Sequence, residues 1–209
     1  MFLGVTADGA STIFKDLVTD PERLLAWHSI FMVMTMIVVA RGVKQGLEKA
    51  VTFLMPLLFG LLILIVIYSM TTGYFFEGVK FLFTPGEIDD KAILIAMGHA
   101  FFTLSLGMGA IMVYGSYLPQ DTSIAKASIA VAVMDTVVAI MAGLVIFPIV
   151  FANGLEPGAG PGLIFQTLPL AFGHMSYGTL FGTLFFVLLV LAAWTSSISI
   201  IEPVITWMM

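Results

Sequence analysis

The chain has 209 residues, of which 60% are hydrophobic and only 10% are charged, and its formal net charge is −5. About a quarter of the residues of a typical soluble domain are charged, so this composition predicts a membrane protein. No basic patch is present to support nucleic-acid binding. The absence of cysteine excludes disulfides and thiolate metal ligands.

A membrane-spanning helix needs roughly 20 apolar residues. Five runs qualify, at about 25–40, 50–72, 92–118, 124–152 and 178–206. We therefore predict an all-α membrane protein with five transmembrane helices in a single domain, 1–209. The first run is short, and we expect it to include Leu24 and its neighbours or to tilt.

The segment 152–177 joins the last two spans. It is too apolar for a free linker, and its glycines and prolines interrupt it too often for a span. It is predicted to be an extracellular re-entrant or lid-like element rather than a plain loop.

The basic residues nearest to membrane ends are Arg41, Lys44 and Lys49, between the first two spans. The positive-inside rule places this loop in the cytoplasm. The N-terminal segment then lies outside and the C-terminus in the cytoplasm, in a multi-pass protein of the plasma or inner membrane. An outer start without a targeting signal, and an end at the edge of a span, lead us to expect an internal fragment of a larger transporter.

The third span contains glycines and hydroxyl residues where a membrane helix should be most regular. The stretch 101–109 reads Phe-Phe-Thr-Leu-Ser-Leu-Gly-Met-Gly. Unpaired backbone groups cost several kcal/mol in hydrocarbon, so a helix breaks there only where it lines a cavity or binds something. Secondary transporters use such midplane breaks to bind substrates and ions. We predict a break here, with Gly107 and Gly109 as hinges.

Asp135 is the only ionisable side chain deep in the fourth span. Carboxylates at this depth usually face a cavity and mark an ion or proton path. The sequence leaves three roles open: a sodium ligand, a protonatable relay, or a carboxylate held by a hydroxyl for packing alone.

The fifth span contains a second polar group. The carbonyl of Ala192 and the hydroxyls of Thr195 and Ser196 stand at i, i+3 and i+4. This spacing places three neutral oxygens on one helix face. A hard cation such as sodium prefers oxygen ligands, as calcium and magnesium do. Back-bonding of the hydroxyls and close helix packing are the alternatives.

Other positions are ambiguous. Gly46 and Pro56 bracket the entrance of the second span and predict either a static kink or a helix end that unwinds. His99 lies one turn before Thr103, where it could line the same cavity or be a satisfied core histidine.

Residues 98–117, from Gly98-His-Ala-Phe-Phe-Thr to Tyr-Gly-Ser-Tyr117, resemble the broken sixth helix of the neurotransmitter:sodium symporter family. Residues 41–56, 142–148 and 195–200 resemble its loop into helix five, its helix seven and its helix eight. Members of known function are sodium-coupled importers of amino acids and amines. The resemblance implies helices four to eight of a twelve-helix fold with two inverted repeats, so the chain would hold a partial inverted-repeat fold.

The resemblance also implies site residues. Thr103 and Asp135 would belong to the first sodium site, and Ala192, Thr195 and Ser196 to the second. Phe102 matches an aromatic lid over the substrate. The positions expected around the substrate are Phe102, Thr103, Ser105, Leu106, Gly107, Met108, Ser197 and Ile200. Met108 and Ile200 predict an apolar pocket for a hydrophobic side chain.

Three positions depart from the family. Ala139 stands where animal members have a chloride-binding hydroxyl, His99 where the family has a glutamine, and Asp135 where it usually has an asparagine. A fixed carboxylate can supply the negative charge that chloride would bring beside a cation. We therefore expect chloride-independent transport, with sodium as the coupling ion and no other cofactor.

The family's first and third helices, which supply further ligands, are not among these residues. We expect the isolated chain to be inactive without its missing helices. Two alternatives belong to other classes. One is an intramembrane enzyme using Asp135 or a pair of Ser116 and His99, whereas we expect a non-enzymatic role. The other is a non-transporting subunit or decayed gene product.

Overall fold

The computed structural model describes residues 7–41, 48–86, 88–157 and 160–208, and these residues form helices and turns. The long helices are α2 (Pro21–Val39), α3 (Lys49–Met70), α7 (Ile124–Ala152) and α9 (Gly178–Met208). The shorter ones are α1 (Ala7–Thr19), α4 (Phe75–Phe83), α5 (Asp90–Thr103), α6 (Ala110–Ser116), the π-helix η2 (Leu163–Thr167) and α8 (Leu168–His174). The prediction of an all-α membrane protein is confirmed.

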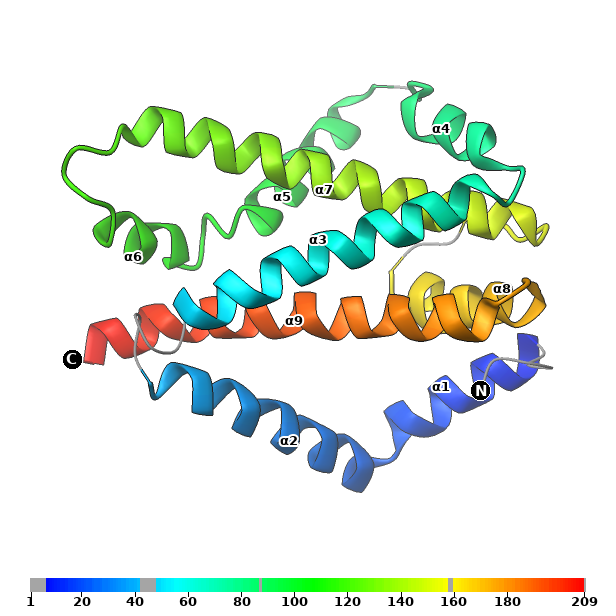
Figure 1. The fold of residues 1–209 in the computed structure, drawn as a ribbon, viewed down its shortest axis with the longest axis horizontal. Coiled ribbons are helices and arrows are strands. Elements are labelled where there is room, and N and C mark those ends of the chain that lie inside the picture. The colour runs from blue at the N-terminus through cyan, green and yellow to red at the C-terminus, as the bar shows by residue number, and fades with distance from the viewer. Residues whose placement is uncertain (1–6, 42–47, 87, 158–159, 209) are drawn as a thin grey trace.

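The long helices form a layered bundle, in which α3 runs between α7 and α9 (Figure 1). Among the described residues, four helices are long and apolar enough to cross a membrane: Pro21–Val39, Val51–Met70, Ile124–Ala152 and Gly178–Met208. The remaining predicted crossing, 92–118, consists of the two short helices α5 and α6. The third of the five predicted spans is therefore broken near its middle, as the sequence predicted.

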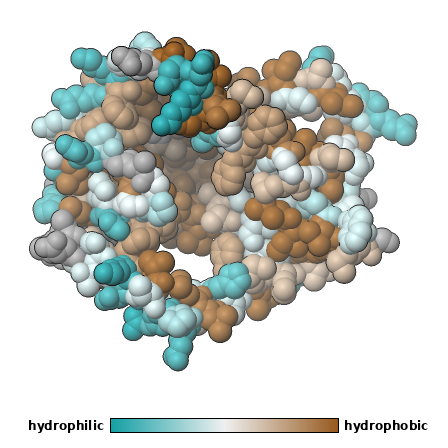
Figure 2. Space-filling view, turned by 180° about the vertical axis from the view of Figure 1, so that it is seen from behind, coloured by the Kyte–Doolittle hydropathy of each residue, from teal (hydrophilic) through white to brown (hydrophobic). Residues whose placement is uncertain are grey.

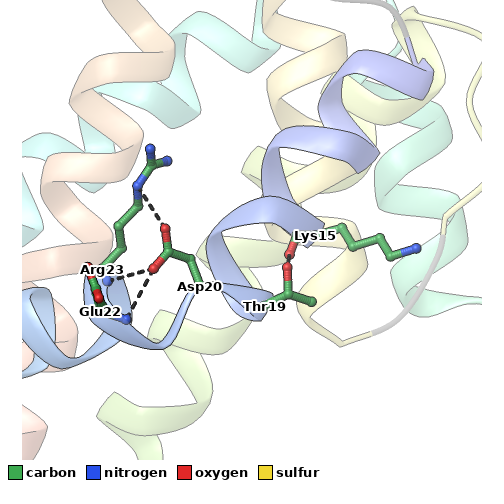
Figure 3. Close-up of polar contacts among 5 residues, drawn as sticks. All are labelled: Lys15, Thr19, Asp20, Glu22 and Arg23. Atoms are coloured by element: carbon green, nitrogen blue, oxygen red, sulfur yellow. Dashed lines mark hydrogen bonds and ion pairs between the residues drawn. The ribbon is translucent and has the colours of Figure 1, made fainter.

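The chain enters α2 through a short polar turn (Figure 3). The Asp20 carboxylate accepts hydrogen bonds from the backbone N–H groups of Glu22 and Arg23 at 3.1 and 3.0 Å. Pro21 takes the first helical position, where no N–H is needed. The Arg23 Nε also lies 3.1 Å from Asp20 Oδ2. This cap starts α2 at Pro21, upstream of the expected start near residue 25, so Leu24 lies in the helix.

A proline in α7 creates a polar contact with α3. Pro148 has no N–H, so the Leu144 carbonyl loses its partner within the helix. The hydroxyl of Ser69, which is fully buried on α3, lies 2.8 Å from that carbonyl oxygen and also 2.8 Å from the carbonyl of Val66. Gly78 on α4 packs on the Pro148 ring so closely that a Cβ would stand 2.6 Å from it. These contacts join α3, α4 and α7.

The main hydrophobic core lies where α3, α7, α8 and α9 meet. Its most buried side chains include Ile65, Ile149, Leu168 and Phe172. The segment 152–177 contributes to this core through α8, so it is a packed helical element. A Cβ on Gly178 would collide with the Phe172 carbonyl, which explains the glycine at the start of α9. Whether this segment acts as a lid stays a prediction.

Much of the surface is apolar, as a bilayer-embedded protein requires. Figure 2 shows brown and beige side chains over the middle of one face, with hydrophilic residues gathered mainly along its edges and a hollow between the helices. Exposed apolar side chains include Phe53, Ile67, Leu94 and Ile129. The chain therefore presents apolar surface to lipid or to further helices.

Candidate functional site

The break in the third span begins with a helix stop at Thr103. Ser105 has a positive φ of 54°, which few residues other than glycine adopt. The Leu106 N–H donates to the Phe101 carbonyl and the Ser105 N–H to the Phe102 carbonyl, both at 3.1 Å. This pair of bonds is the Schellman motif, which closes the end of a helix in the left-handed region. The sequence predicted the break through its glycines, but the residue that turns the chain is a serine.

The helix resumes after Gly109, whose φ of +77° puts it in the left-handed region. Its carbonyl accepts from the Val113 N–H at 3.1 Å and starts α6. Between the two ends, the carbonyls of residues 103–108 accept none of the backbone hydrogen bonds found within the described ranges. The break therefore leaves backbone oxygens available for a ligand, which is what a midplane interruption offers in a transporter.

The last residue of α5 meets the carboxylate of α7. Thr103 Oγ1 donates to Asp135 Oδ1 at 2.9 Å. The structure therefore brings together the two residues expected to form the first sodium site. Asp135 keeps its second carboxylate oxygen, and the backbone oxygens of the break follow directly after Thr103. Among the described residues no group of three His, Asp or Glu side chains could hold a metal ion, so a cation here would depend largely on neutral oxygens.

The second group of oxygens lies on α9. Thr195 Oγ1 donates to the Ala192 carbonyl at 2.9 Å, and Ser199 Oγ donates to the Thr195 carbonyl at 3.1 Å. Thr195 is buried and Ser196 is exposed. A Thr195 hydroxyl whose proton is used in this way keeps its lone pairs for a cation. Within the described part of the chain, no hydrogen bond joins this group to the pair of Thr103 and Asp135, so the two oxygen groups are separate and lie on different helices.

The residues expected around the substrate fall into two sets. Those on the break are contiguous, and the large apolar ones are exposed: Phe102 at 76%, Leu106 at 47% and Met108 at 40%. Ile200 on α9 is 48% exposed. Ser197, by contrast, contacts α2: its Oγ lies 3.2 Å from Thr35 Oγ1.

Two of the three positions that depart from the family, His99 and Ala139, are exposed. His99 precedes Thr103 by one turn on α5, and Ala139 follows Asp135 by one turn on α7. They therefore flank the pair of Thr103 and Asp135 along their helices. Ser116, the serine considered as a nucleophile beside His99, donates its proton to the Val113 carbonyl at 2.7 Å.

Of the two hinge candidates of the second span, the structure describes only Pro56. Pro56 lies inside α3, which continues from Lys49 to Met70 across it. Gly46 lies outside the described residues. An unwinding helix end at this place therefore stays a prediction.

One polar cluster was missed by the sequence analysis. The Tyr117 hydroxyl donates to Glu202 Oε1 at 3.0 Å and lies 2.9 Å from Thr206 Oγ1. Glu202 is only 5% exposed on α9. Because the tyrosine proton goes to the carboxylate, Thr206 is the donor to the tyrosine oxygen. An acidic residue in the sequence Ile-Ile-Glu-Pro within a span was the available signal. The cluster joins the end of α6 to α9.

A broken span, a carboxylate hydrogen-bonded to the end of the helix before the break, and a second set of neutral oxygens are typical of secondary transporters. Comparison with known proteins identifies the family. Residues 17–209 match the sodium:neurotransmitter symporter family, and the chain belongs to this family of sodium-dependent symporters. It is thus a multi-pass membrane protein, and sodium is the coupling ion that the family implies.

Several relatives agree with this assignment. The chain is 40% identical over 204 residues to the uncharacterized sodium-dependent transporter YhdH of Bacillus subtilis, covering 97% of this chain and 45% of that protein. It is 36% identical over 212 residues to an uncharacterized sodium-dependent transporter of Haemophilus influenzae, covering 96% and 46%. The crystal structure of MhsT in complex with L-phenylalanine matches with a TM-score of 0.81 at 44% identity, covering 97% of this chain and 46% of that one. The chain therefore spans about half the length of the relatives that it matches.

Proposed function

We propose that this chain is part of a sodium-coupled transporter that imports amino acids or related small amines by alternating access. The observation that carries the proposal is the hydrogen bond from Thr103 to Asp135 at the break of the third span. A carboxylate oriented beside free backbone oxygens is a suitable half of a sodium site. The missing ligands would come from helices outside this chain, because the chain covers 45% of its relative YhdH.

The proposed substrate is an amino acid with an apolar side chain. Phe102, Leu106 and Met108 are exposed at the break rather than packed in a core, so they are free to surround an apolar group. MhsT, to which the chain is similar, was crystallised with L-phenylalanine. The proposal keeps Ser105, Gly107 and Ile200 as further candidates near the substrate, whereas Ser197 contacts α2.

We further propose that transport does not require chloride, and that the N-terminal segment lies outside the cell and the C-terminus inside. Asp135 supplies a fixed negative charge beside the cation, and Ala139 offers no hydroxyl to a halide. The cluster of Arg41, Lys44 and Lys49 supports a cytoplasmic loop between the first two spans.

Uptake measurements test the proposal. The complete transporter that contains this chain is reconstituted in liposomes, and labelled phenylalanine uptake is measured with an inward sodium gradient and with potassium in its place. We expect uptake only with sodium. Asp135→Asn should abolish or strongly weaken it, whereas Asp121→Asn, in the loop after α6, should not. Liposomes containing the 209-residue chain alone should show no uptake. Equal uptake with both cations would disprove sodium coupling.

A further inference from the structure

Thr35 is a fully buried hydroxyl residue on α2. Its neighbours along the helix are apolar, from Phe31 to Val39, and Val38 and Val39 form a small core with Ile198 of α9. A hydroxyl in such a place costs free energy unless it is hydrogen-bonded. The buried hydroxyl therefore requires a hydrogen-bond partner.

Thr35 makes two polar contacts. Its Oγ1 donates to the Phe31 carbonyl at 3.0 Å and lies 3.2 Å from Ser197 Oγ. Either hydroxyl can supply the proton between Thr35 and Ser197. This contact joins α2 to α9 through two polar atoms.

This hydrogen bond acts on the helix that carries the second group of oxygens. An α-helix turns by about 100° per residue, so Ser197 lies about 160° around α9 from Thr195 and about 100° from Ser196. Holding Ser197 against α2 therefore directs Thr195 to nearly the opposite side of α9.

We propose that Thr35 is a positioning residue for the second sodium site: its hydrogen bond with Ser197 sets the rotation of α9 and so aims the oxygens of Ala192, Thr195 and Ser196. α2 runs beside the C-terminal half of α9 (Figure 1). The inference rests on the proposed function, since it needs a sodium site on α9. It assigns Ser197 to the contact with α2 rather than to the substrate.

The test measures sodium binding rather than transport alone. The complete transporter in detergent is titrated with radioactive sodium, and its thermal midpoint is recorded in parallel. Thr35→Val removes the hydroxyl at nearly constant volume, and Thr35→Ser keeps it. Ser197→Ala breaks the same bond from α9 with little risk to folding. Val38→Ala weakens the same packing cluster without touching the hydrogen bond, and is the matched control.

We expect Thr35→Val and Ser197→Ala each to raise the half-saturating sodium concentration about tenfold, as the loss of a group that orients metal ligands does. The double variant should be no worse than either single one, and Thr35→Ser should restore binding. Val38→Ala should lower the thermal midpoint while leaving sodium binding within about twofold of the unsubstituted protein.

Two results would overturn the inference and can be told apart. If the unsubstituted transporter binds no sodium, the proposed function fails and the positioning role with it. If it binds sodium but Thr35→Val and Ser197→Ala leave the titration unchanged, or shift it no more than Val38→Ala does, the function stands and Thr35 has only a packing role. Should Thr35→Val not fold, Ser197→Ala gives the answer by itself.

Discussion

Thr103 and Asp135 are joined by a hydrogen bond of 2.9 Å between the last residue of α5 and the middle of α7. The bond crosses from a helix that stops inside the bilayer to one that runs through it. It orients the carboxylate, and the carbonyls of residues 103–108 accept none of the backbone hydrogen bonds found within the described ranges. Three substitutions separate the contributions of these two residues.

Thr103→Val should weaken sodium binding by about tenfold, because it removes an oxygen and the donor that orients the carboxylate. Asp135→Asn should weaken it by more, about thirtyfold, since it also removes the negative charge. Thr103→Ser should retain most of the affinity. Half-saturating sodium concentrations for amino-acid uptake measure all three, and equal values for Thr103→Val and Thr103→Ser would contradict the role of the hydroxyl.

Uptake should be unchanged when chloride is replaced by gluconate at constant sodium. The reason is that Asp135 supplies a fixed negative charge where a chloride ion would otherwise be needed. If uptake collapses in gluconate, the charge-substitution hypothesis is wrong, whatever the sodium dependence.

Gly109→Ala should impair transport. Gly109 has a φ of +77°, and a residue with a Cβ pays about 1–2 kcal/mol in that region. Its Cβ would meet only Pro203 Cβ at 3.8 Å, an ordinary contact, so the cost is backbone strain at the break. Gly98→Ala in the middle of α5 is the control: nothing lies within 4 Å of its Cβ, and alanine favours the helix. Uptake rates normalised to the amount of folded protein compare the two, and equal rates would mean that the break tolerates a different turn.

Ser69→Ala should lower the thermal stability by about 1–3 kcal/mol, because the Leu144 carbonyl would be left buried without a donor. Ser116→Ala is the control, since its hydroxyl is exposed and donates only to the preceding turn. Adding Pro148→Ala supplies an N–H for Leu144, so Ser69→Ala should cost less in that background. Thermal midpoints in detergent give the comparison, and strict additivity of the two substitutions would disprove the shared partner.

Tyr117→Phe should loosen the contact between α6 and α9, because Glu202 loses its donor. The chain has no cysteine, so a single cysteine at Ala110, which is only 2% exposed on α6, reports the separation of α6 from α9. Loss of a net 1 kcal/mol, a typical value for one hydrogen bond, should raise the labelling rate about fivefold. Thr84→Val, which removes only a local bond on α4, should not change it. Identical labelling in both variants would show that this hydrogen bond does not hold the end closed.

The sequence predicted the place of the break and the partners at its edge. Polar groups are expensive in hydrocarbon, so Thr103, Asp135 and the glycines stand out against their apolar surroundings. The sequence did not predict that Ser105 turns the chain, because a left-handed serine depends on the bonds that close the end of α5. It also missed α4 and the helical content of 163–174, which short apolar runs do not specify.

What the sequence alone determined is the class: long apolar runs require helices, and a run interrupted by glycine requires a cavity or a ligand. Only the tertiary structure decided which polar groups pair across helices. Thr35 meets Ser197, Ser69 meets the Leu144 carbonyl and Tyr117 meets Glu202, over separations that no local pattern encodes. The reason is physical. Hydrophobicity acts without direction and is readable from composition, whereas a hydrogen bond exists only once packing has brought its two atoms within about 3 Å.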